Sequence, residues 1–232
     1  MQTIGLIGGM SWESTAQYYR LINEQVKERL GGLHSAKIIL YSVDFAEVED
    51  LQQRGEWKQA TTLMVKAGQR VKAGGADFIV ICTNTMHRLA DQVELQTALP
   101  VLHIADATAR VIAEAKIGVV GLLGTRYTME EEFYRGRLET RYGLEVLIPE
   151  EDDRTFVHDV IYNELCLGVT RDESRRAYLD IIKQLEQRGA AAVILGCTEI
   201  GLLIGPTDTD TLLFDTTRIH AEAAADRAVE SS

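Results

Sequence analysis

The sequence predicts an α/β protein made of two similar halves, each built on a doubly wound parallel sheet. Short apolar runs alternate along the chain with longer stretches whose apolar residues recur at helical spacing. Strands of a parallel sheet are covered by helices on both faces, so they are nearly continuous in apolar residues. In addition, two sets of motifs recur at an almost constant distance, which indicates an internal duplication.

The apolar runs are the expected strands, and the amphipathic stretches are the expected helices. The strands cover residues 3–7, 37–43, 77–82, 101–104, 116–121, 191–196 and 212–214. The helices cover residues 15–30, 57–73, 105–115, 128–142, 171–188 and 216–229. In such proteins ligands bind at the carboxyl ends of the strands.

The duplication aligns two residues that can each carry a proton. GLIGGMSWEST, which starts at Gly5, shares two glycines and a threonine with GVVGLLGTRYT, 113 residues later. GADFIVICTNT, which starts at Gly75, matches GAAAVILGCTE at a distance of 114 residues, and this aligns Thr83 with Cys197. We expect residues 1–98 and 209–232 to form the first half and residues 99–208 the second. A pseudo-twofold axis would then place Thr83 and Cys197 on opposite sides of one cleft.

Composition excludes several classes of function. The net charge is −11 without a basic stripe, so nucleic acid and anionic membranes are unsuitable partners. No apolar run is long enough to span a membrane, and no charged-then-apolar leader precedes the first expected strand. The three cysteines are widely spaced and form no CxxC motif, which argues against a disulfide framework or a metal site. We therefore expect a cytoplasmic protein.

Adjacent Cys82 and Thr83 cannot both face the same cleft, because successive side chains at a strand end point to opposite faces. The duplication aligns Cys82 with Gly196, so this position needs no reactive group. We expect Cys82 to be a small buried side chain, as free cysteines usually are, and Thr83 to face the ligand.

Both loops lead into expected helix starts. Unpaired backbone N–H groups at a helix start suit a carboxylate, so Asn84, Thr85, Thr198 and Glu199 are candidate ligand-binding residues. The same position is expected to lower the pKa of the Cys197 thiol toward neutrality. The alternative is that these polar residues only cap the helices.

These motifs resemble those of the aspartate/glutamate racemase family, which also includes hydantoin racemases. GGMSWEST, from Gly8, resembles the family's GGMGPxAT, and TNTMH, from Thr83, resembles its CNTxH. LGCTEI, from Leu195, resembles the GCTE motif around the second cysteine, and GLLGTRYT, from Gly121, is a further family stretch. The likeness runs over essentially the whole chain.

The resemblance implies racemisation of an amino acid without a cofactor, by two cysteines on opposite faces of the α-carbon, in a homodimer. This chain departs from the pattern, because Thr83 stands where the family has its first cysteine. Cys197 is then expected to act as thiolate base on the L-enantiomer. Thr83 would relay a proton to the carbanion and would be a poor base for the D-enantiomer, so we expect an apparent preference for L-substrate.

The substrate is less closely specified by the sequence. Family aspartate racemases carry an arginine after the second strand, whereas this chain has an acidic run from Asp44. Gln52 could donate a hydrogen bond there, and Met10 could either form part of the wall of the cleft or pack beneath it. Arg54 is the nearest cation, and both it and Gln52 could instead lie on a solvated helix face. An acidic amino acid is favoured by the resemblance, and a broader range fits if Arg54 points away.

Other functions stay open. A one-thiol relative, such as a hydantoin racemase or a decarboxylase, would also need only Cys197. A binding module that lost its first base would bind an amino acid without reaction. A nucleotide site is disfavoured, because GLIGGM is not GxGxxG and no Walker lysine follows it.

Overall fold

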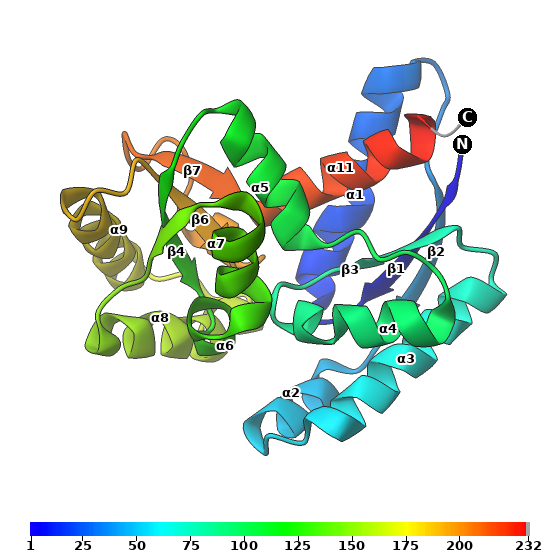
Figure 1. Cartoon of the computed structure of the whole chain (residues 1–232), viewed down its shortest axis with the longest axis horizontal. Coiled ribbons are helices and arrows are strands. Elements are labelled where there is room, and N and C mark those ends of the chain that lie inside the picture. The colour runs from blue at the N-terminus through cyan, green and yellow to red at the C-terminus, as the bar shows by residue number, and fades with distance from the viewer. Residues whose placement is uncertain (231–232) are drawn as a thin grey trace. The chain divides into compact units, whose positions relative to one another are not determined.

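The computed structural model describes residues 1–230, which divide into two compact units (Figure 1). Unit 1 comprises Met1–Ile104 and the chain from His220 onward, and unit 2 comprises Ala105–Ile219. Each unit contains one parallel sheet with helices packed on it, so the α/β fold class is confirmed. No helix of the described chain is both long enough and apolar enough to cross a membrane.

Unit 1 is built on a three-stranded sheet with the order β2-β1-β3. Its strands are β1 (Thr3–Gly8), β2 (Lys37–Ser42) and β3 (Phe78–Ile81). Its helices are α1 (Trp12–Leu30), α2 (Phe45–Gln53), α3 (Trp57–Ala73), α4 (Ala90–Thr97), the short 3-10 helix η1 (Thr85–Leu89) and most of α11 (Thr216–Glu230).

The two faces of this sheet belong to separate hydrophobic clusters, because side chains alternate along each strand. Ile4 and Leu6 of β1 pack with apolar residues of α1 and with four alanines of α11. Ile7 packs on the other face with residues of α3 and α4. Helices therefore cover both faces, as the apolar strand pattern predicts.

Unit 2 is built on a four-stranded sheet with the order β5-β4-β6-β7. Its strands are β4 (Val119–Gly124), β5 (Glu145–Leu147), β6 (Ala192–Gly196) and β7 (Leu212–Asp215). Its other elements are α5 (Ile104–Glu114), α6 (Arg126–Glu130), the π-helix η2 (Glu132–Gly136), α7 (Arg137–Tyr142), α8 (Glu151–Asn163), the 3-10 helix η3 (Leu165–Leu167), α9 (Asp172–Gln187) and α10 (Ile200–Leu203).

Strand register tests the expected duplication. Gly5 of β1 lies beside Ile79 of β3, and Gly121 of β4 lies beside Val193 of β6. The 113-residue and the 114-residue alignments therefore cannot both hold, because Gly5 corresponds to Gly121 and not to Gly118 if Ile79 corresponds to Val193. A glycine-rich strand offers several registers, and only the neighbouring strand selects one. Ile79 and Val193 are 114 residues apart, and the alignment of Thr83 with Cys197 at this distance stays a prediction.

The boundary between the halves differs from the expected one. β7 pairs with β6, so it belongs to the second sheet and does not return to the first half. In unit 1 its counterpart is Val101, which forms a single bridge to Ile79 in place of the strand expected at residues 101–104. The chain passes from unit 1 to unit 2 after Val101 and returns to unit 1 after β7. Helix α5 therefore follows the last strand position of unit 1 but lies almost wholly in unit 2, and α11 follows the last strand of unit 2 but lies mostly in unit 1.

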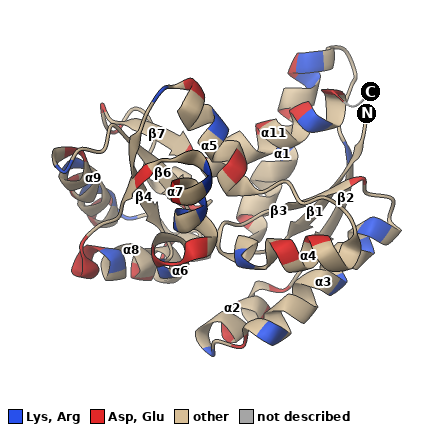
Figure 2. Ribbon diagram, in the orientation of Figure 1, with Lys and Arg blue, Asp and Glu red and all other residues tan. Residues whose placement is uncertain are grey.

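Acidic and basic residues occur together on the helices of both units (Figure 2). This agrees with the absence of a basic stripe from the sequence. Several of the charges form exposed ion pairs, such as Arg29 with Asp226 and Arg54 with Asp50. Exposed pairs of this kind contribute little to stability.

Candidate active site

Cys82 and Thr83, the two residues that follow β3, differ in their exposure to solvent. Cys82 has no exposed surface and packs in the cluster beneath α1 and α11, where burial raises the pKa of its thiol far above the usual range. Thr83 is partly exposed. The predicted assignment of Cys82 to the core is therefore confirmed.

The equivalent loop after β6 shows why glycine precedes Cys197. A side chain at Gly196 would place its Cβ 2.9 Å from the carbonyl oxygen of Leu123 and 2.8 Å from a methyl of Leu122. The neighbouring strand β4 thus leaves no space at this position. The alternation of the strand then turns Cys197 to the other side, as it turns Thr83 in unit 1.

Cys197 lies against a carboxylate. Its Sγ donates a hydrogen bond to Oε2 of Glu199 over 3.0 Å, and the Thr198 hydroxyl donates to the same oxygen over 2.7 Å. All three residues are buried. The thiol, hydroxyl and carboxylate therefore form one hydrogen-bonded group in a poorly solvated place.

The expectation of a lowered Cys197 pKa is wrong. Burial raises the pKa of this thiol well above its ordinary value, and the negative charge of Glu199 raises it further. Helix α10 has only four residues, so its dipole is small beside these effects. Cys197 therefore rests as a thiol that shares its proton with Glu199.

Tyr178 of α9 is a neighbour of Cys197 that the sequence does not reveal. Burial raises the pKa of its hydroxyl well above the ordinary value, and the neighbouring Cys197 raises it further. The hydroxyl donates to the carbonyl oxygen of Val157 in α8 over 3.0 Å. Helical spacing marks Tyr178 only as an inward-facing residue, so its closeness to the thiol follows from packing alone.

The loop after β3 contains Asn84 and Thr85, both of which are buried. The backbone N–H of His87 donates to the carbonyl oxygen of Asn84 over 3.1 Å. The His87 ring lies 2.7 Å, through Nδ1, from the carbonyl oxygen of Thr83. These contacts hold the Thr83 loop to helix η1.

Met10 lies in the turn between β1 and α1 and is buried in the cluster beneath α3 and α4. Gly9 before it has a φ of +93°, and a Cβ there would lie 2.2 Å from the carbonyl oxygen of Val43. The Thr15 hydroxyl closes this turn, accepting from Gly9 N–H over 2.8 Å and donating to the carbonyl oxygen of Ser11 over 2.7 Å. The GGMS motif is therefore needed for the shape of this turn.

Helix α2 carries Gln52 on its buried face. The Gln52 amide donates to the sulfur of Met86 in η1 over 3.0 Å, which ties α2 to the loop that follows β3. Arg54 at the end of α2 is largely exposed and pairs with Asp50 and Glu56. Arg54 is thus held among acidic side chains, away from the face that carries Gln52.

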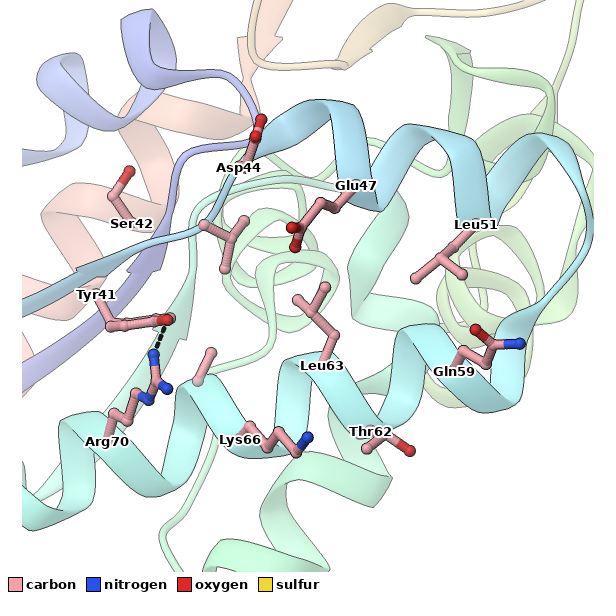
Figure 3. Close-up of a pocket in the computed structure, with 12 residues that line it drawn as sticks. Tyr41, Ser42, Asp44, Glu47, Leu51, Gln59, Thr62, Leu63, Lys66 and Arg70 are labelled. Carbon is pink, nitrogen blue, oxygen red and sulfur yellow. Dashed lines mark hydrogen bonds between the residues drawn. The ribbon is translucent and has the colours of Figure 1, made fainter.

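An adjacent face of α2, which carries Glu47 and Leu51, borders a groove of about 630 Å³ in unit 1. Glu47, Leu51 and Leu63 point into the space between α2 and α3 (Figure 3). At one end the Arg70 guanidinium stacks over the Tyr41 ring at 4.6 Å and donates to its hydroxyl. None of the side chains predicted for the site lines this groove, so it is separate from the Thr83 loop.

Within residues 1–230 no group of three or more His, Cys, Asp or Glu side chains is arranged to hold a metal ion. The chemically capable groups are instead those at the ends of equivalent strands. One unit presents a thiol next to a carboxylate, which can accept and return a proton. The other presents a hydroxyl, which can donate a proton but is a weak base.

Comparison with known proteins gives a consistent result. Residues 7–224 match the family model described as Asp/Glu/Hydantoin racemase. A candidate Asp/Glu racemase from Yersinia pestis has 57% sequence identity and a TM-score of 0.92, with 99% of this chain and 100% of that chain covered. An aspartate racemase homologue from Pyrococcus horikoshii has 32% identity and a TM-score of 0.84 over the same shares. The broad specificity amino-acid racemase RacX of Bacillus subtilis is 21% identical over 95% of both chains.

Proposed function

The chain belongs to the Asp/Glu/hydantoin racemase family and is an isomerase, and we propose that it racemises amino acids without a cofactor, using Cys197 and Thr83. The observation that carries the proposal is the Cys197–Glu199 hydrogen bond at the end of β6. Thr83 follows β3 at the position that the duplicated motif aligns with Cys197.

Cys197 removes the α-proton of the L-enantiomer. The thiol passes its own proton to Glu199, and the thiolate then takes the α-proton from the substrate. Because burial raises the pKa of Cys197, the thiolate is a strong base once formed. A thiolate paired with a buried carboxylate is short-lived, which limits its side reactions with solvent species.

Thr83 supplies a proton to the opposite face of the carbanion. An alcohol is a much weaker acid than a thiol, so proton transfer from Thr83 to the carbanion is slow. The reverse transfer, from the substrate to Thr83, is slower still. The position of Glu199 corresponds to Thr85 in the first half, so no carboxylate stands beside Thr83 in that motif. The two halves are therefore unequal in both the proton carrier and its partner.

We propose a broad choice of side chains that includes acidic ones. Arg54 is engaged by Asp50 and Glu56, so it is poorly placed to bind a side-chain carboxylate. Gln52, Met10, Asn84, Thr85 and Thr198 are the remaining proposed substrate-binding residues. The names of the relatives support both parts of this choice, since they include a broad specificity racemase and an aspartate racemase homologue.

Proton NMR in D2O tests the mechanism with a panel of L- and D-amino acids. We expect L-substrate to exchange its α-hydrogen faster than it inverts, because Cys197 often returns a deuteron to the face from which it took the proton. Enantiomers have equal free energy in water, so kcat/KM must still be equal in the two directions. Equal rates of exchange and inversion would contradict the role of Thr83.

Two cysteine variants provide the control for this experiment. Cys197→Ser is expected to lose exchange and inversion, whereas Cys82→Ala, a change at a cysteine sealed in a hydrophobic cluster of unit 1, should keep both. Binding of amino acids without any exchange would show a binding module and overturn the proposal.

We also propose that the enzyme is a cytoplasmic homodimer. Family resemblance supports the dimer, and the three free cysteines fit a reducing compartment. Light scattering after size exclusion measures the mass, and a monomer at micromolar concentration would contradict the dimer.

A further inference from the structure

Three buried histidine rings meet in unit 1. The His87 ring centre lies 4.7 Å from that of His103 and 5.4 Å from that of His220. These residues come from three separate places in the chain. His87 is in η1, His103 comes just before the chain leaves unit 1 at Ile104, and His220 is where the chain re-enters it.

The hydrogen bonds of His87 define its tautomer. The backbone N–H of Ile104 donates to Nε2 of His87 over 3.2 Å, so Nε2 is the unprotonated nitrogen. Nδ1 then carries the proton and donates it to the Thr83 carbonyl oxygen over 2.7 Å. His87 therefore joins the Thr83 loop to the segment at which the chain leaves unit 1.

His220 fixes the same segment from the other side. Its Nε2–H donates to the carbonyl oxygen of Leu102 over 2.8 Å, and the Tyr18 hydroxyl donates to its Nδ1 over 2.9 Å. Burial and the neighbouring His87 lower the pKa of His220 to about 3, so it is neutral at physiological pH. Leu102 to Ile104 is thus held by two neutral imidazoles.

The second unit has no imidazole in the corresponding position. The counterpart of His87, 114 residues later, is Gly201, and the Cys197 carbonyl oxygen accepts from the backbone N–H of Ile200 over 3.2 Å. Cys197 is oriented by Glu199 through its own side chain. Thr83 is instead fixed through its backbone, because its carbonyl oxygen accepts a hydrogen bond from the side chain of His87.

We propose that His87 is a positioning residue for the reaction, which fixes the Thr83 backbone so that the hydroxyl keeps its direction toward the substrate. This inference rests on the proposed function. Thr83 acts in inversion but not in exchange of the L-enantiomer at Cys197. Loss of the His87–Thr83 hydrogen bond should therefore lower inversion selectively, whereas a loss of folded protein would lower both rates in proportion.

Two substitutions separate the two nitrogens of His87. In His87→Asn the side-chain amide can reproduce the donor at Nδ1, and in His87→Gln it can reproduce only the more distant Nε2 position. We expect His87→Gln to lower the ratio of inversion to L-exchange about tenfold, because small misplacements of a catalytic group have effects of this size. His87→Asn should keep the ratio close to that of the wild type. Tyr18→Phe is the matched control, because it disturbs the histidine group without touching Thr83 and should leave the ratio unchanged.

The result is read from NMR in D2O with L-substrate. An unchanged ratio in His87→Gln, or equal losses in His87→Gln and His87→Asn, would overturn the inference. If His87→Gln fails to fold, His87→Leu takes its place, since it lacks the donor and buries no unpaired polar atom. Thr83→Val separates this inference from the proposed function. Full inversion in Thr83→Val would refute the role of Thr83 itself, whereas lost inversion with an unchanged ratio in His87→Gln would refute only the role of His87.

Discussion

Cys82 and Thr83 are neighbours in the chain, yet one is sealed in a hydrophobic cluster and the other is partly exposed after β3. The sequence alignment of the two halves pairs the exposed position with Cys197, and on this alignment it can accommodate a thiol. We predict that Thr83→Cys raises the rate of inversion and lets D-substrate exchange its α-hydrogen. Both rates are measured by NMR in D2O, with Cys82→Ala as a control that removes the neighbouring thiol. A Thr83→Cys protein no faster than the wild type would argue against our assignment of Thr83.

The raised pKa of Cys197 has a measurable consequence. At neutral pH the thiolate fraction is small, so alkylation by iodoacetamide should be slower at Cys197 than at the partly exposed Cys166, and slowest at Cys82. Between pH 7 and pH 9 the Cys197 rate should rise about tenfold per pH unit, because reaction follows the thiolate. Mass spectrometry of peptides gives the three rates, with protein unfolded in guanidinium as the reference. A Cys197 rate that is already constant at pH 7 would show a lowered pKa instead.

The sequence predicts which side chain at the end of β3 is buried better than it predicts the acidity of Cys197. Strand alternation and the duplication suffice to separate Thr83 from Cys82, because both depend on local geometry. The pKa of Cys197 depends on burial and on the distance to Glu199, which arise only when the chain has folded. A motif that ends in a helix start favours a lowered pKa, but α10 is too short to outweigh those effects.

At the scale of elements, α3 approaches α4 through Gly68. A Cβ at this position would lie 2.8 Å from the Thr97 methyl and 3.2 Å from a Val93 methyl. The Thr97 methyl cannot turn away easily, because its hydroxyl donates to the Val93 carbonyl oxygen over 2.7 Å.

We therefore predict that Gly68→Ala destabilises the protein by about 1–2 kcal/mol, although alanine favours helix by about 1 kcal/mol. Gln69→Ala, at the exposed neighbouring position, should change stability by less than about 0.5 kcal/mol. Urea unfolding measures both changes. A Gly68→Ala protein more stable than the wild type would show that the two helices can separate at little cost.

Most strands and longer helices follow from apolar periodicity, and α3 matches its expected range of residues 57–73. The elements that the pattern misses have physical reasons for being missed. β5 has only three residues, and α8 begins with an acidic stretch that gives no apolar stripe in its first turn. Val101 forms a bridge of only one residue, whereas unit 2 has the full strand β7 at the corresponding place. The length of such a strand depends on how it pairs with its neighbour, which apolar periodicity does not report.

At the scale of the whole molecule, buried His220 makes stability depend on pH. An unfolded histidine takes up a proton below pH 6.5 or so, whereas burial keeps His220 neutral in the fold until about pH 3. Between these values the unfolded state binds one more proton, so the free energy of unfolding falls as the pH falls. We predict a loss of about 2 kcal/mol between pH 7 and pH 5 from this residue.

Urea unfolding at a series of pH values tests this prediction. The lowered pKa of His158 acts in the same direction, so the informative quantity is the difference between the wild type and His220→Gln. Glutamine can still donate to the Leu102 carbonyl oxygen from the Nε2 position, but it has no proton to gain. Parallel curves for the two proteins would contradict the prediction.

Helix α11 has a consequence for how the newly made chain folds on the ribosome. The strands of the first sheet are all translated by residue 81, but Ala221, Ala224, Ala225 and Ala228, which cover one of its faces, are translated only after the whole of unit 2. A nascent chain therefore carries Ile4, Leu6, Phe78 and Val80 without their final cover throughout the synthesis of unit 2. The first sheet is made before unit 2 but is sealed only after it, and during that interval it presents a surface that chaperones recognise.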